Sequence, residues 1–207
     1  KMTLLQHDPY DPEKIAVNEQ IILEYYRSEG YPMVRVNSRT ETVEPDLETA
    51  GNKFRVVFEM EEKPRVYLSD IYISGAKFYS ELDIKRFILS SEIDCVSWAN
   101  QSGLFREEMI NQDLFMITQH YLKKGFIKVF IDKPEVTLIH NPDYSRVDVR
   151  LKISEGDQYF TGEITVSGDI LGEKEKLMEG ILLEEGEIYK PFLQNRDRSG
   201  ISQIYHE

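Results

Sequence analysis

The chain repeats itself, and a repeat constrains the fold more than any single motif because every copy has to form the same supersecondary unit. The stretch 26–31 contains an aromatic residue, three further residues, a glycine and a second aromatic residue, and it recurs 95 residues later as 121–126. The matching positions are Tyr26, Gly30 and Tyr31 in the first copy and Tyr121, Gly125 and Phe126 in the second. Aromatic pairs 16 residues apart occur at Tyr10 and Tyr26, at Phe105 and Tyr121, and at Tyr189 and Tyr205.

A second block of similarity strengthens the repeat. Residues 54–75 align with residues 147–168 without a gap, at a distance of 93 residues. The alignment places Ile71 on Ile164 and Ile73 on Val166, and it superimposes the Ser-Gly pairs that end at Gly75 and Gly168. Two blocks in the same order at nearly the same distance indicate a tandem array with a period of 93 to 95 residues.

Helices are predicted where apolar residues recur at helical spacing. The stretch 107–124 carries one apolar stripe, formed by Ile110, Leu114, Ile117 and Tyr121. Gly125 then supplies the left-handed residue that commonly ends a helix. In the first copy Asp11 can cap a helix that has Pro12 in its first turn and Gly30 at its end.

Strands are predicted where apolar and polar residues alternate. One face of residues 147–153 is apolar, with Val147, Val149, Leu151 and Ile153, and the first copy repeats it with Phe54, Val56, Phe58 and Met60. The unit that begins near Arg65 therefore has the order β-α-α-β-β, with elements at about 66–74, 80–90, 107–124, 127–138 and 146–154. About ninety residues suffice for a small sheet with two helices on one face, while the polar face stays in water.

This unit resembles the polypeptide-transport-associated (POTRA) repeat. The similarity is carried by the helix exits at 26–31 and 121–126, by Glu155-Gly156 after the last strand, and by the first strands that close at Gly75 and Gly168. The resemblance implies an α+β fold of tandem β-α-α-β-β units, each a three-stranded mixed sheet covered on one face by two helices. Tandem copies are typical of the periplasmic arm of outer-membrane assembly factors similar to BamA, where a barrel follows the last repeat.

The chain is expected to hold one complete unit and two partial ones. Residues 1–63 would supply a second helix and the last two strands, residues 64–156 a complete unit, and residues 157–207 a first strand and helices. The complete unit has an insert near 91–103, where Trp98 is a candidate contact residue and Cys95 has no sequence-level partner. The first copy has Glu62-Lys63-Pro64 where the second has Glu155-Gly156, so its turn departs from the family pattern.

The second strand of each unit is the candidate binding site, because an extended polypeptide can pair with an exposed sheet edge through main-chain hydrogen bonds. The candidate residues are Met33, Val34, Arg35, Val36 and Asn37 in the first copy and Ile127, Lys128, Val129, Phe130 and Ile131 in the second. Pro134 also favours an edge position, because a proline cannot donate to a β-ladder. The same proline and the nearby lysines equally fit a protected edge that binds nothing.

The resemblance implies a substrate-docking and scaffold arm at the periplasmic face of the bacterial outer membrane. Its expected partners are unfolded outer-membrane proteins and accessory periplasmic lipoproteins, with membrane contact only through a barrel that this sequence does not contain. The arm of an autotransporter-assembly (TamA-like) factor or of a two-partner secretion transporter remains an alternative. The resemblance implies neither an enzyme nor a cofactor.

Composition limits the other function classes. The 207 residues are 41% hydrophobic, and 37 acidic against 25 basic side chains give a net charge of −12, which opposes a nucleic-acid partner. Cys95 is the only cysteine, so neither a disulfide framework nor a cysteine-based zinc site can form within the chain. No catalytic residue or metal ligand is assigned. A carboxylate-dependent enzyme that uses the acidic run at Glu184 and Glu187 is the rival from another class, although a turn is the simpler interpretation of that run.

Overall fold

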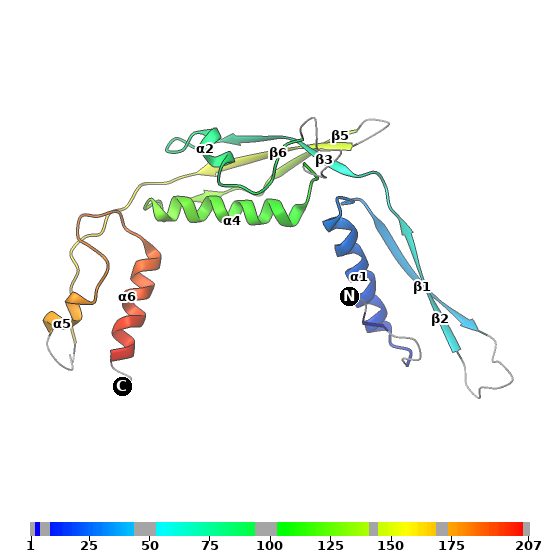
Figure 1. Ribbon diagram of the computed structural model, residues 1–207, viewed down its shortest axis with the longest axis horizontal. Coiled ribbons are helices and arrows are strands. Elements are labelled where there is room, and N and C mark those ends of the chain that lie inside the picture. Colours follow the sequence, from blue (N-terminus) through cyan, green and yellow to red (C-terminus); the bar gives the residue numbers. More distant parts are fainter. Residues whose placement is uncertain are drawn as a thin grey trace. The chain divides into compact units, whose positions relative to one another are not determined.

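The computed structural model describes residues 3–4, 9–43, 53–93, 103–140, 145–168 and 174–204. The predictions for Cys95, Trp98 and Tyr205 lie outside these residues. The elements of the described part are α1 (Pro12–Ser28), β1 (Arg35–Val43), β2 (Lys53–Glu61), β3 (Val66–Ser74), α2 (Glu81–Lys85), α4 (Glu107–Lys123), β4 (Phe130–Ile131), β5 (Glu135–His140), β6 (Ser145–Ser154), α5 (Lys174–Glu179) and α6 (Pro191–Ile204) (Figure 1).

The chain divides into two compact units. One is built from Lys1–Ile71, Ser90–Ile110 and Val136–Val149, and the other from Tyr72–Leu89, Asn111–Glu135 and Arg150–Glu207. Strands β3 and β6 and helix α4 contribute residues to both units. Every contact between repeats described below lies inside one of these units.

Helix α1 begins as predicted. The side chain of Asp11 accepts hydrogen bonds from the backbone N–H groups of Glu13 and Lys14, and Pro12 occupies the first turn. The helix packs against β1, which pairs with β2 in an antiparallel register from Arg35 opposite Glu61 to Val43 opposite Lys53. The first copy therefore consists of one helix on a two-stranded sheet.

The face of the β1–β2 sheet that carries Arg35 and Arg39 is charged and exposed. Arg39 Nε lies 2.9 Å from Glu59 Oε1, and Arg35 Nη1 lies 3.9 Å from Glu61 Oε2. Val34 lies just before β1 and Val36 is its second residue, and each is only 5% exposed. Exposed ion pairs of this kind add little stability, but they keep this face in water. The predicted wet face is therefore present in the first copy.

The middle sheet has the strand order β3-β6-β4, and β5 also pairs with β6. Strand β6 alternates as predicted, with its apolar residues buried at Val147, Val149, Leu151 and Ile153. The prediction of one continuous strand at 127–138 is wrong, because Ile127 and Lys128 form a turn and the strand divides into β4 and β5. Pro134 lies in the break, where a residue without an N–H group cannot extend the ladder.

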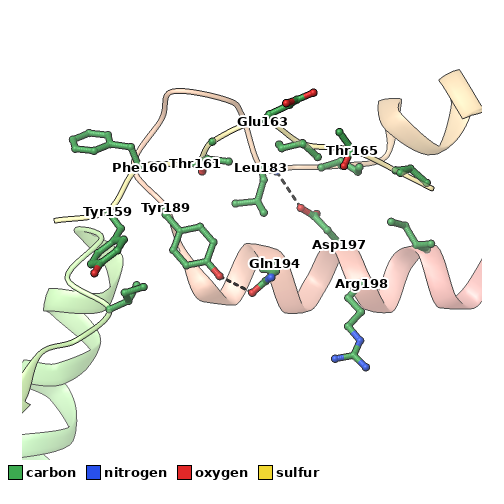
Figure 2. A pocket seen from close by; sticks show the side chains of 16 residues that line it. Tyr159, Phe160, Thr161, Glu163, Thr165, Leu183, Tyr189, Gln194, Asp197 and Arg198 are labelled. Atoms are coloured by element: carbon green, nitrogen blue, oxygen red, sulfur yellow. Dashed lines mark hydrogen bonds between the residues drawn. The ribbon is translucent and has the colours of Figure 1, made fainter. Parts of the chain in front are cut away.

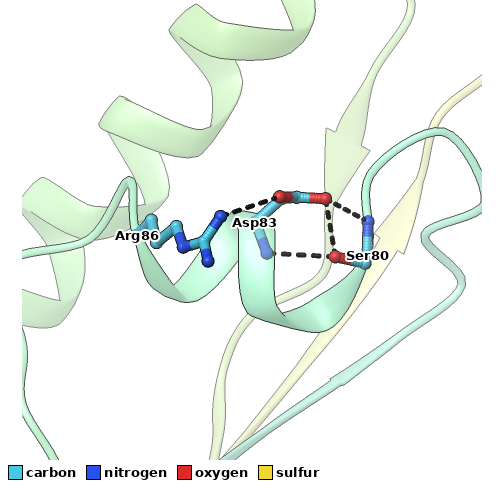
Figure 3. A network of polar contacts seen from close by, with 3 residues as sticks. All are labelled: Ser80, Asp83 and Arg86. Atoms are coloured by element: carbon cyan, nitrogen blue, oxygen red, sulfur yellow. Dashed lines mark hydrogen bonds and ion pairs between the residues drawn. The ribbon is translucent and has the colours of Figure 1, made fainter.

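The first helix of the middle repeat is shorter than the predicted 80–90. Helix α2 spans only Glu81–Lys85, and it begins at a capping box in which Ser80 and Asp83 bond reciprocally (Figure 3). Arg86 Nη1 lies 3.6 Å from Asp83 Oδ1. Beyond Arg86 the chain turns so that the N–H group of Leu89 reaches the carboxylate of Asp113 on α4, at 2.6 Å. That bond ends the helix because it commits the next residues to a different backbone path.

The third copy begins without a strand. Phe160 forms only an isolated bridge with Ile188, and residues 161–167, which the sequence predicts as a first strand, form no strand with any described residue. A strand needs a neighbour for its peptide groups. The described residues after Gly168 supply helices α5 and α6, so the part of the third copy that the structure describes holds no equivalent of β6.

One buried polar residue recurs in all three copies, and the sequence analysis did not identify it. Asn18, Asp113 and Asp197 occupy equivalent positions of α1, α4 and α6, and they are 0%, 1% and 8% exposed. Each accepts backbone N–H groups from an earlier segment: Thr3 for Asn18, Leu89 for Asp113, and Leu182 and Leu183 for Asp197. The side chain therefore ties a loop to the long helix of its repeat.

We expect Asp113→Ala to lower the free energy of unfolding by about 1–3 kcal/mol, because it leaves a buried N–H group without its acceptor. Asp113→Asn should cost less, since Asn18 performs the same task in the first copy. Urea unfolding followed by circular dichroism measures both. Gln112→Ala, at the exposed neighbouring position, is the control, and an equal loss in that variant would contradict the assigned role.

Candidate site: strand edges and the joints between repeats

The repeated motif from tyrosine to glycine to aromatic residue is a helix C-cap. The N–H group of Gly30 donates to Arg27 O at 3.1 Å and that of Tyr31 to Tyr26 O at 3.0 Å, and the second copy repeats both bonds. Gly30 has φ 87° and Gly125 has φ 82°, the left-handed conformation that this Schellman motif requires. The aromatic rings pack across the cap, with centroids 5.8 Å apart in the first copy and 5.6 Å in the second.

The same glycines join one repeat to the next. Gly30 O accepts a hydrogen bond from the N–H group of Val66 at 3.0 Å, and Gly125 O accepts one from Tyr159 at 2.9 Å. Val66 and Tyr159 are equivalent residues, 93 apart, in the first-strand segments of successive repeats. Each repeat is thus connected to the following one through one main-chain bond at the end of its long helix.

At Gly125 the joint is too close for a side chain, whereas at Gly30 a side chain would press on the flexible end of Leu104. A Cβ atom on Gly30 would lie 2.8 Å from Leu104 Cδ2, and one on Gly125 would lie 2.6 Å from Tyr159 O and 3.0 Å from Ile188 Cγ2. Leu104 and Ile188 are again equivalent residues, because each immediately precedes the aromatic residue that starts the 16-residue spacing. The joint between the first and second copies is therefore built like the joint between the second and third.

A tyrosine and a glutamate close each of the first two repeats. Tyr121 donates its hydroxyl to Glu155 Oε1 at 2.8 Å, and Tyr26 donates to Glu62 Oε1 at 3.2 Å. Burial raises the pKa of Tyr121, and the bond to Glu155 raises it further. Burial also raises the pKa of Glu155, but hydrogen bonds from the N–H groups of Phe78 and Lys77 and from Tyr121 outweigh it, so this pKa lies below its ordinary value.

The turn at Lys63 keeps the family conformation despite its different sequence. Lys63 has φ 57° and the equivalent Gly156 has φ 70°, so the lysine adopts the left-handed conformation of the glycine it replaces. Gly75, which closes the first strand, has φ 81°, and a Cβ atom there would lie 2.1 Å from Ile153 O. Gly168 also has a positive φ, of 119°, but nothing lies within 4 Å of its Cβ position.

The first predicted edge lies on β1. Met33 and Val34 precede the strand, while Arg35, Val36 and Asn37 are its first three residues. Within the described residues β1 pairs only with β2, so one edge of this nine-residue strand has no neighbour there. Strand β1 contains no proline, and its edge is therefore a continuous row of donors and acceptors.

The second predicted edge is shorter and interrupted. Ile127, Lys128 and Val129 precede the strand, and only Phe130 and Ile131 belong to β4. Phe130 is 62% exposed, while the Lys128 ammonium lies 5.3 Å from the centroid of the Tyr159 ring. The edge resumes in β5, whose residues 135–139 are exposed. As a template for an incoming strand it is weaker than β1.

The edge of β3 is covered over part of its length by the borders of the insert. Leu68 donates its N–H group to Gly103 O at 2.7 Å and accepts from the N–H group of Ile93 at 2.8 Å. Phe105 donates to Val66 O at 2.9 Å. The same pattern recurs in the third copy, where Thr161 bonds to Glu187 and Gly186. Over residues 66–68 this edge is therefore not available to an incoming strand.

The acidic run of the rival enzyme hypothesis forms a turn. Gly186 has φ 81°, and the N–H group of Glu187 donates to Glu184 O at 3.2 Å. Glu185 accepts the N–H group of Ile164 at 2.8 Å, so its carboxylate has a structural role. Within the described residues no group of three or more His, Cys, Asp or Glu side chains could hold a metal ion. None of the described helices is both long and apolar enough to cross a membrane.

We expect Gly125→Ala to destabilise the protein by at least about 3 kcal/mol, because left-handed strain adds to a clash with the Tyr159 carbonyl. Gly186→Ala is the matched control, since its φ of 81° is the same within a degree but its Cβ position is open. The control should lose only the strain of about 1–2 kcal/mol. Equal losses in thermal or urea unfolding would show that the joint is not tightly packed.

The low pKa of Glu155 predicts a pH dependence. Stability that comes from a lowered carboxyl pKa is present above the ordinary value of 4.5 and is lost as the pH falls through the folded value. We expect Glu155→Gln to flatten the curve of unfolding free energy against pH below about pH 5. Glu135→Gln, at the exposed start of β5, should leave the wild-type slope unchanged. A wild-type slope in the Glu155 variant would refute the prediction.

Comparisons with known proteins agree with the repeated unit described above. The POTRA family model, described as "Surface antigen variable number repeat", matches residues 66–156. The chain is 26% identical over 173 residues to the outer membrane protein assembly factor BamA of Nitratidesulfovibrio vulgaris, covering 83% of this chain and 20% of that protein. It is 24% identical over 209 residues to a putative outer membrane protein assembly factor of Treponema pallidum, covering 100% of this chain and 24% of that protein.

A solved structure has the same fold. The crystal structure of Haemophilus influenzae BamA POTRA3-5 superimposes with a TM-score of 0.52 at 14% identity, over 97% of this chain and 73% of that one. The chain spans only 20% to 24% of the length of the two curated relatives named above. Residues 66–156 thus match the POTRA family, and the chain is similar to part of outer membrane protein assembly factors, BamA among them.

Proposed function

We propose that this chain is a substrate-docking and scaffold arm at the periplasmic face of the outer membrane. It receives unfolded outer-membrane proteins and accessory lipoproteins by β-strand addition at its open edges. Its units are residues 1–63, 64–156 and 157–207, and each contains all or part of the β-α-α-β-β order. The support for the function is the family together with the unpaired edge of β1.

The β1 edge carries the proposal because, of the two edges predicted from the sequence, it offers the longer run of available peptide groups in the described residues. Strand β1 has nine residues in continuous register with β2, whereas β4 has two. Main-chain pairing depends little on the sequence of the incoming strand. Such an edge therefore suits substrates that share alternating barrel strands but no common side-chain motif.

The joints support the scaffold part of the proposal. Among the described residues, a main-chain bond to a left-handed glycine connects each repeat to the next. Such a joint limits the conformations that the linker can adopt, because the residues on both sides are fixed by a helix cap and a strand.

The alternatives lack an observation of their own. The arm of a TamA-like factor or a two-partner secretion transporter would use the same edges, but the curated relatives named above are assembly factors. The enzyme hypothesis relied on the acidic run at 184–187, whose residues are exposed and form a turn. Neither alternative displaces strand addition as the conclusion.

We expect an unfolded peptide with the sequence of an outer-membrane barrel strand to shift the backbone amide resonances of β1 more strongly than those of β4 and β5. The reason is that the β1 ladder is longer and lacks a proline. A titration followed by NMR on the labelled chain measures both sets of shifts, which should saturate with peptide concentration.

The matched control is the same peptide methylated at alternate backbone nitrogens, which keeps its side chains but removes its donors. Loss of the β1 shifts with this peptide supports ladder formation. Unchanged shifts, or shifts concentrated in α1 and α4, would mean that side chains rather than strand edges hold the substrate.

A further inference from the structure

The joint between the first and second repeats, called the first joint below, holds two arginines at opposed positions. Tyr67 forms an antiparallel bridge with Leu104. Arg65 and Arg106 lie two residues beyond that bridge on the two segments, so they are opposite each other and on the same face as the bridged pair. Both arginines belong to one compact unit. Like charges at opposed positions destabilise a pair of strands, so this placement carries an electrostatic cost.

The face that carries the two arginines lies against the end of the first repeat. Leu104 is the side chain that a Cβ atom on Gly30 would touch. Arg65 Cζ lies 5.1 Å from the centroid of the Tyr31 ring. The face of an aromatic ring attracts a guanidinium group, but it supplies no strong acceptor for the five N–H donors of that group. The ring therefore holds Arg65 in place and leaves its donors to another group.

Neither arginine has an acidic partner among the described residues. Arg65 Nε and Arg106 Nε are buried, and no described atom accepts a hydrogen bond from either. The ion pairs found in the described part of the chain include neither guanidinium group. Glu62, three residues before Arg65, accepts the hydroxyl of Tyr26 instead, and Glu107, next to Arg106, is exposed. Two positive charges whose donors lack acceptors have the chemistry of an anion site.

The second joint has the same backbone as the first. The N–H group of Tyr189 donates to Tyr159 O at 3.0 Å, which places these tyrosines on neighbouring segments (Figure 2). The equivalent bond in the first joint runs from the N–H group of Phe105 to Val66 O at 2.9 Å. The two joints can therefore be compared residue by residue.

The side chains at the arginine positions differ between the joints. Gln158 is equivalent to Arg65, and Lys190 is equivalent to Arg106. Gln158 is neutral, and its Nε2 donates to Lys124 O at 2.9 Å. The second joint thus forms without a pair of arginines. The pair in the first joint is therefore not a requirement of the joint itself.

We propose that Arg65 and Arg106 bind a phosphate group at the first joint. Two guanidinium groups match the charge of a phosphate near neutral pH, which is close to two negative charges, and each can donate two parallel hydrogen bonds to it. A carboxylate has one charge and matches only one of the arginines. The phosphate belongs either to free inorganic phosphate or to a lipid headgroup. This site uses neither the β1 edge nor the β4 edge and does not depend on strand addition.

The test is an NMR titration of the labelled full chain with inorganic phosphate, in which chloride keeps the ionic strength constant. The side-chain Nε–H resonances of Arg65 and Arg106 should shift together and saturate. The Nε–H resonance of Arg150, which lies 5.3 Å from the Tyr72 ring centroid without a second arginine opposite, should not saturate. No shift at the pair, or the same shift with chloride alone, would overturn the proposal.

Variants separate binding from the structural role of the arginines. The double variant Arg65→Gln, Arg106→Lys gives the first joint the side chains of the second, so it should fold and bind phosphate at least about tenfold more weakly. Arg65→Lys keeps the charge but loses the planar fork, so it should also bind more weakly. Arg150→Gln removes the same charge elsewhere and should bind as the wild type does. Wild-type affinity in the double variant, or an equal loss in Arg150→Gln, would refute the site.

Vesicles identify the source of the phosphate. Cosedimentation with phosphatidylcholine vesicles that contain phosphatidic acid, lost in the double variant, would assign a lipid headgroup and support the site. Saturable phosphate shifts without cosedimentation would support a site for free phosphate. Cosedimentation that the double variant retains, together with no phosphate shift, would overturn the proposal. Failure of the β1 peptide titration would leave these outcomes unchanged, because they are measured at other residues.

Discussion

One main-chain hydrogen bond joins a repeat to the next and occurs twice among the described residues. Gly30 and Gly125 end the long helices of their repeats, and their carbonyl groups accept the first N–H group of the next repeat, from Val66 and Tyr159. A glycine is favoured at both positions because the cap requires a positive φ, and at Gly125 also because the following repeat approaches too closely for a Cβ atom. One residue thus serves the helix end and the joint together.

The same cap determines where each candidate edge begins. The N–H group of Val34 donates to Tyr31 O at 3.2 Å, and that of Val129 donates to Phe126 O at 3.2 Å, so both copies make one turn before their strands start. The strands then begin at the equivalent residues Arg35 and Phe130. The strands differ in length, because β1 has nine residues and β4 has two. The equivalent edges therefore start alike but offer different lengths of ladder.

The sequence predicted the elements whose signal is local or periodic. The cap at Asp11, the alternation of β6 and the stop at Gly125 each rest on a single physical rule, and the structure contains all three. Helix α2 was predicted too long, because the bond from Leu89 to Asp113 is a tertiary contact that no local pattern reveals. The strand at 127–138 was predicted without its break, although Pro134 was recognised as a residue that cannot donate to a ladder.

Other features could be predicted only by comparing the copies of the repeat position by position. Asn18, Asp113 and Asp197 are polar residues beside apolar helix stripes, and aligning the three helices would have shown that they coincide. Lys63 looked like a departure from the pattern, yet it adopts the conformation of Gly156, because the turn is fixed by the strands on both sides.

The most direct test of the account is to detect main-chain contacts between a bound, unfolded barrel-strand peptide and β1. Nuclear Overhauser effects between backbone protons of an isotope-labelled peptide and those of residues 35–43 would report a ladder. The account predicts a regular series of such contacts along β1, in a single register. Contacts confined to side chains of the helices, with none along the β1 backbone, would contradict it.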